Sequence, residues 1–159
     1  MTKKADFNAE EWSTVVEGPL LAGMRVITAD RGGTIRESLA MGKVYAQARQ
    51  RHGENEFLDE LVSSPPTLDQ ERVRAAGDVG AASTEGLRAA VGILEQKASP
   101  DEVEAYRRFV LDVAEAAARA HKEGGFVGIG GKQVSESEQA ALDEIAATLG
   151  TSAGADSDA

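Results

Sequence analysis

The chain has 159 residues, of which 42% are hydrophobic and 28% charged, and its net charge is −10. Such a charge is repelled by nucleic-acid phosphates and by anionic lipid, so we expect neither nucleic-acid binding nor membrane insertion. The chain has no cysteine, which excludes disulfides and thiolate metal sites. No apolar run approaches the roughly 20 residues that span a bilayer. These properties predict a soluble protein located in the cytoplasm.

Composition and length together predict the fold class. Alanine dominates the hydrophobic set and aromatic residues supply only 4%, which favours helix over strand. The length suits one domain with a core of its own. We expect an all-α, single-domain antiparallel bundle of about seven helices over residues 8–150. Residues 1–7 are expected to be a flexible N-terminus and residues 151–159 a disordered acidic tail.

In chain order, the first half contains capping residues at the start of three of its five predicted helices. Asn8 and Glu11 form a capping box, and similar boxes begin at Thr34 and Thr67. Pro19 is expected to kink or restart the first helix, because it lacks an N–H and crowds the preceding turn. The predicted helices of this half cover 9–17, 19–29, 35–51, 54–63 and 68–80.

The second half shows the same chemistry with clearer apolar spacing. Ser99 with Glu102 and Ser135 with Glu138 form two further capping boxes, and Gly150 is a helix stop. The predicted helices cover 84–98, 100–122 and 136–149. In the second of these, one apolar face is expected to consist of Val103, Tyr106, Val110, Val113, Ala117 and Ala120.

The first and last parts of the chain share a sequence pattern. A capped acidic start, an apolar helix, a double glycine and a second capped helix occur once from Asn8 and again from Ser99. Two related helical hairpins packed together would form such a bundle.

The second of these segments resembles the tellurite-resistance TerB family. The resemblance rests on the apolar helix 109–120, Glu123-Gly-Gly and the capped start at Ser135, and on the turn Asp30-Arg-Gly-Gly with Glu37 after it. It implies an all-helical domain, a link to tellurite and other stress responses, and divalent-cation binding at acidic turns. On this basis Asp30 and Glu123 are the expected cation-facing acids. Their residue type also suits capping and solubility, and oxygen ligands of this kind suit a divalent cation.

The glycine-rich loop after residue 123 is the other segment with functional potential. A phosphate loop is excluded because Phe126 occupies a required glycine position, and a dinucleotide fingerprint is excluded because Gly128-Ile-Gly130 is not completed at position 133. It remains a connector between helices or a hook for a protein partner. In either case Phe126 and Ile129 are the expected contact residues.

No catalytic constellation is evident, and no cofactor other than a divalent cation is expected. His52 suits a helix C-terminal cap, and His121 suits a half-buried position near a helix C-terminus. The most consistent function is a non-enzymatic binding or scaffold module with a protein partner. Two alternatives remain open: a small carboxylate-dependent enzyme with a helix-lined pocket, which a pair of buried acids beside His121 would support, and a structural homodimer.

Overall fold

The computed structural model describes residues 1–29, 35–64, 71, 74, 75, 77–124 and 135–150, with positions 35 and 121–124 described by their backbone alone. All regular structure in these residues is helical, as predicted. A 3-10 helix, η1 (Lys4–Asp6), is followed by α1 (Ala9–Ala29), α2 (Ile35–Gln50), α3 (Glu56–Ser63), α5 (Val79–Lys97), α6 (Pro100–Gly124) and α7 (Glu136–Leu149). The helix expected over 68–80 is described in part: residues 71, 74 and 75 are helical, but Asp78 caps the next helix, α5, which begins at Val79 and not at the expected residue 84.

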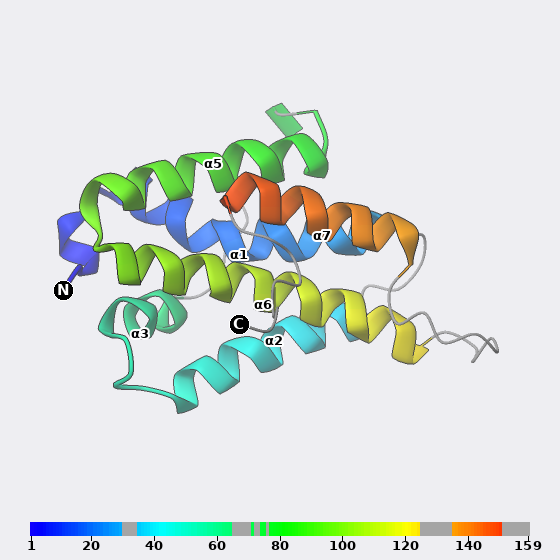
Figure 1. Ribbon diagram of the computed structural model, residues 1–159, viewed down its shortest axis with the longest axis horizontal. Helices are drawn as coiled ribbons and strands as arrows, with labels where there is room; N and C mark the ends of the chain where they lie inside the picture. Colours follow the sequence, from blue (N-terminus) through cyan, green and yellow to red (C-terminus); the bar gives the residue numbers. More distant parts are fainter. Residues whose placement is uncertain (30–34, 65–70, 72–73, 76, 125–134, 151–159) are drawn as a thin grey trace, which may run out of the picture.

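The long helix α6 runs through the middle of the bundle (Figure 1). On one side of it lie α1, α5 and α7, and on the other lie α2 and the short α3. α1 packs mainly against α5 and α6, whereas α1 and α2 touch each other little. The first expected hairpin, α1 with α2, is therefore not a tight helical pair, and the relation between the two hairpins stays a prediction.

The core forms where these helices bury their apolar faces. The face predicted for α6 is confirmed, because all six of its members are buried. An aromatic group joins the N-terminal segment to three helices: Phe7, Trp12, Phe57 and Tyr106 have successive ring centroids 5.4, 6.3 and 6.5 Å apart. None of the helices in the described part of the chain is long and apolar enough to cross a membrane.

The capping chemistry read from the sequence is confirmed where the structure describes it. The Glu11 N–H donates to Asn8 Oδ1 over 2.8 Å, and the Asn8 N–H donates back to Glu11 Oε2 over 2.9 Å. Ser135 and Glu138 form the same reciprocal box at the start of α7. Gly150 ends α7 in the left-handed conformation, with φ of 76°. The boxes expected at positions 34 and 67 begin outside the described residues.

The expectation that Pro19 divides the first helix in two is wrong, because α1 is one helix of 21 residues. Pro19 cannot donate to the carbonyl of Val15, four residues earlier. The hydroxyl of Tyr106, on α6, donates to that carbonyl instead, over 2.8 Å. Gly18 makes room for it, since a Cβ at this position would lie 2.0 Å from Tyr106 Oη. A side chain from another helix therefore supplies the hydrogen bond that proline removes.

The N-terminal segment packs against the start of α6. Thr2 is buried, and its N–H and hydroxyl donate to the Glu102 carboxylate over 2.8 and 2.6 Å. Glu102 also accepts the Ser99 N–H over 2.8 Å, as the predicted capping box requires. Burial acts to raise the pKa of Glu102, but the hydrogen bonds from Thr2 and Ser99 outweigh it and lower the pKa to about 2. The flexibility expected of residues 1–7 stays a prediction that amide hydrogen exchange would test.

Candidate functional site

Three of the four residues expected at a functional site lie outside the described residues: Asp30, Phe126 and Ile129. Glu123 belongs to the last turn of α6, where the structure describes the backbone alone, and the same holds for His121. The cation-facing and partner-contact roles of these residues therefore stay predictions. Elsewhere in the described part of the chain, no three His, Asp or Glu side chains gather as a metal-binding group.

A surface cleft lies between α2, α3 and α6, and no motif in the sequence predicts it. Its volume is about 790 Å³. This is within the range of roughly 300–1,000 Å³ that is usual for binding sites. Its apolar lining comes from both sides: Ala40, Val44, Ala48 and Leu58 from α2 and α3, and Ala105, Phe109, Ala116 and Ala120 from α6.

Charged side chains of both signs surround this apolar lining. The basic ones are Lys43, Arg51, Arg108 and Arg119, and the acidic ones are Glu54, Asp59, Asp112 and Glu115. Ten of the eighteen lining residues are polar or charged, so the cleft is more polar than a typical small-molecule pocket.

Two of the four acids already have partners within the chain. Glu115 pairs with Arg119 one turn later on α6, over 3.1 Å. Asp59 Oδ2 accepts the Gly53 N–H over 2.9 Å and lies 2.8 Å from His52 Nδ1. The imidazole of His52 thus holds the turn between α2 and α3. This bears out the expected position of His52 at a helix end, where the backbone N–H of His52 also donates to the Arg49 carbonyl over 3.3 Å.

Asp112 lies among the arginines of the cleft. Partial burial raises its pKa even though the charges of Arg108, Arg51 and Arg119 act to lower it. Arg108 and Arg119 lie on α6, and Arg51 lies in the turn directly after α2, so two segments far apart in the sequence place arginines around one carboxylate.

The burial of two acids was not predicted from the sequence. Glu17 on α1 and Glu37 on α2 are each only 2% exposed, and both take part in polar interactions within the fold. Glu37 has the spacing of a capping residue, three positions after Thr34, and Glu17 belongs to no motif. Neither lines the cleft.

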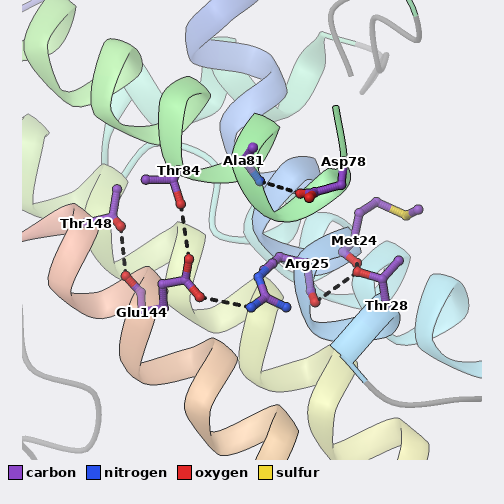
Figure 2. A network of polar contacts seen from close by, with 8 residues as sticks. All are labelled: Met24, Arg25, Thr28, Asp78, Ala81, Thr84, Glu144 and Thr148. Atoms are coloured by element: carbon purple, nitrogen blue, oxygen red, sulfur yellow. Dashed lines mark hydrogen bonds and ion pairs between the residues drawn. The ribbon is translucent and has the colours of Figure 1, made fainter. Parts of the chain in front are cut away.

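A separate polar network joins three helices on the opposite side of the bundle (Figure 2). Glu144 of α7 binds Arg25 of α1 over 2.9 Å and accepts the hydroxyl of Thr84 on α5 over 3.2 Å. Near it, Asp78 caps α5 by accepting the Ala81 N–H over 2.7 Å. Arg25 and Glu144 bind each other across this interface, so the network explains how the helices are held and leaves the cleft as the stronger candidate site.

In the part of the chain that the structure describes, the fold is an all-helical bundle, and a groove with charged side chains lies between α2, α3 and α6. No protein-family model matches the chain, and the searches of curated proteins and of solved structures found no match.

Proposed function

We propose that this chain is a non-enzymatic binding module and that the cleft between α2, α3 and α6 receives its partner. The observation that carries the proposal is the make-up of the cleft, with a floor of small apolar side chains inside a ring of charges. Protein interfaces combine an apolar centre, a polar rim, and enrichment in arginine and aromatic residues. The cleft has the apolar centre, the charged rim and the arginines, which are Arg51, Arg108 and Arg119, and its lining includes one aromatic residue, Phe109.

The alanines on both walls favour a helical partner. Ala40, Val44 and Ala48 follow one another at four-residue spacing, which places them in one row along α2. Ala116 and Ala120 form a similar row on α6. Small side chains in such rows let the backbone of a third helix approach closely, as in grooves that bind amphipathic helices.

The TerB resemblance supplies a biological setting for this proposal. A scaffold in a stress or tellurite response would use such a groove to hold a partner protein. Cation binding at the acidic turns would be a separate property of the same module.

The test uses three fluorescent amphipathic helical peptides that share a leucine face and carry glutamate, glutamine or lysine on the other face. Fluorescence anisotropy measures their binding to the wild-type chain and to Ala48→Trp/Ala116→Trp, which fills the cleft. The matched control is Ala89→Trp, an exposed alanine of α5 outside the cleft. Circular dichroism verifies that each variant folds.

We expect at least one peptide to bind the wild type and the control, and to lose binding when the cleft is filled. Binding that survives the filled cleft would contradict the proposal, as would no binding by any peptide. Sedimentation at two concentrations addresses the homodimer alternative. Concentration-dependent association that the filled cleft abolishes would identify a second copy of the chain as the occupant.

A further inference from the structure

The charges around the cleft balance, although the molecule as a whole is strongly acidic. Four basic and four acidic side chains line the cleft, so their formal charge is zero. The whole chain has 17 basic and 27 acidic residues, so the 13 and 23 that lie outside the cleft lining account for the entire net charge of −10. The cleft is therefore an electrically neutral region on a molecule that otherwise attracts cations and repels anions.

Charges of both signs in the cleft are available to a partner. Glu115 and Arg119 neutralise each other. Asp59 keeps its negative charge, because it binds a backbone N–H and the imidazole of His52, which is neutral at pH 7. The exposed lining residues whose side chains form no hydrogen bond or ion pair within the described part of the chain are Lys43, Arg51, Arg108, Glu54 and Asp112. With Asp59 included, three cations face three acids.

The two signs alternate along the cleft, whose walls α2 and α6 lie side by side (Figure 1). On one wall Lys43 of α2 is followed by Arg51 and Glu54 in the turn after the helix. On the other wall Arg108 and Asp112 are one turn apart on α6. Arg51 and Arg108 act electrostatically on Asp112 from the two walls. A partner with charges of one sign would therefore place some of them beside like charges, which is unfavourable.

From this arrangement we infer that the occupant of the cleft is an amphipathic helix of a partner protein whose polar side carries both acidic and basic residues and little net charge. The inference rests on the proposed binding function and adds the chemistry of the partner. The acids of this helix pair with Lys43, Arg51 and Arg108, and its basic residues pair with Glu54 and Asp112. Its apolar side packs on the two alanine rows.

A uniformly charged helix fits the cleft less well. An acidic helix is repelled at long range by the net charge of −10, and the balanced lining offers it no excess of cations. A basic helix is attracted to the acidic molecule in general, so the neutral cleft gives it no preferred position. A helix with both signs escapes the long-range repulsion and can form ion pairs in the cleft.

The test adds a fourth peptide, with the same leucine face and equal numbers of glutamate and lysine on the other face. Fluorescence anisotropy measures all four peptides on the wild type, on Lys43→Gln/Arg51→Gln and on Glu54→Gln/Asp112→Asn. The controls are Arg88→Gln and Glu85→Gln, two exposed positions of α5 outside the cleft. We expect the mixed peptide to bind tightest, and each double variant to weaken it on the order of fivefold. Because this peptide has no net charge, the controls should leave its affinity unchanged.

Binding of the glutamine peptide as tightly as the mixed peptide would overturn the inference, as would weakening by only one of the two double variants. If another peptide binds best and the filled cleft abolishes that binding, the inference fails while the proposed function stands. Binding by none of the four peptides overturns both. Self-association in sedimentation that the double variants abolish would make a second copy of the chain the occupant, and would likewise overturn the inference.

Discussion

Of two buried tyrosine hydroxyls, one makes a hydrogen bond and the other has no partner among the described residues. Comparing them measures what one hydrogen bond contributes to stability. Tyr106 donates to the Val15 carbonyl, whereas the Tyr45 hydroxyl is buried without a partner among the described residues. Burial raises the pKa of Tyr45 to about 12, against the opposing charge of Arg49. The ring of Tyr45 packs edge-on against Phe109, with centroids 5.2 Å apart. Its contribution is thus apolar packing, whereas Tyr106 adds a polar contact.

We predict that Tyr106→Phe lowers the free energy of unfolding by about 1–3 kcal/mol, because it leaves the buried Val15 carbonyl without a donor. Tyr45→Phe is the matched control. It removes a hydroxyl that has no partner to lose, so it should change stability by less than about 0.5 kcal/mol or increase it. Urea denaturation of both variants measures the difference. Equal losses would show that the Val15 contact adds nothing to stability.

At the scale of the elements, the close approach of α1 and α6 depends on the residue before the proline. A Cβ at position 18 would overlap Tyr106 Oη at 2.0 Å but would meet the ring carbon Cζ at 3.3 Å. The hydroxyl is thus the principal obstacle to a larger residue.

We predict that Gly18→Ala destabilises the wild type by about 1–3 kcal/mol through overpacking. The same change should cost much less in Tyr106→Phe, where the obstructing oxygen is absent. Alanine also has the better helix propensity, by about 1 kcal/mol. Denaturation of the two single variants and the double variant gives the coupling energy. Additive effects would show that α1 and α6 do not meet at this contact.

The turns between helices are the place to test the cation prediction drawn from the TerB resemblance. A divalent cation at 100 times its dissociation constant would add about 2.7 kcal/mol to the native state. For a domain of this size, that is a rise of several degrees in Tm. We expect thermal unfolding of the wild type to show this rise with one member of a cation panel. Asp30→Asn/Glu123→Gln should abolish it, and no rise with any ion would refute the prediction.

For the molecule as a whole, Glu102 links folding to pH. Its pKa falls from an ordinary value of 4.5 to about 2, and the side chain is only 7% exposed. A lowered folded-state pKa stabilises the protein above the unfolded value and loses that effect as the pH falls through the folded one. The linkage amounts to about 3 kcal/mol, lost between roughly pH 4.5 and 2.

We therefore predict that Glu102→Gln flattens the fall in stability across this acid range and lowers stability at neutral pH. Glu104→Gln, an exposed position two residues later on α6, is the control and should leave the acid profile as it is in the wild type. Urea titrations at a series of pH values measure both profiles. A wild-type slope in Glu102→Gln would assign the acid sensitivity to other groups.

Much of the fold could be predicted from the sequence because it is encoded locally. The boxes at Asn8 and Ser135 and the buried face containing Val110 and Val113 need only neighbours within a few turns. Continuity of α1 through Pro19 could not be predicted, because the compensating donor is 91 residues away from Val15.

The cleft escaped prediction for the same reason. Its walls are α2 and α6, which are far apart in the sequence and meet only in the packed bundle. Read separately, Arg51 and Arg108 are ordinary surface charges, and the alanine rows are ordinary helix composition. Acidic and glycine-rich turns stand out in the sequence instead, because their residue types are unusual.

The contact of Gly18, Pro19 and Tyr106 also indicates how evolutionary relatives of this chain can be recognised. If the tyrosine alone were replaced, the Val15 carbonyl would have no donor, because the proline has no N–H. If the glycine alone were replaced, its Cβ would overlap the tyrosine hydroxyl. Evolution should therefore retain the three residues as a set or discard them together. A Gly-Pro pair in the first helix that covaries with a tyrosine in the long central helix would then mark common ancestry after overall similarity has faded.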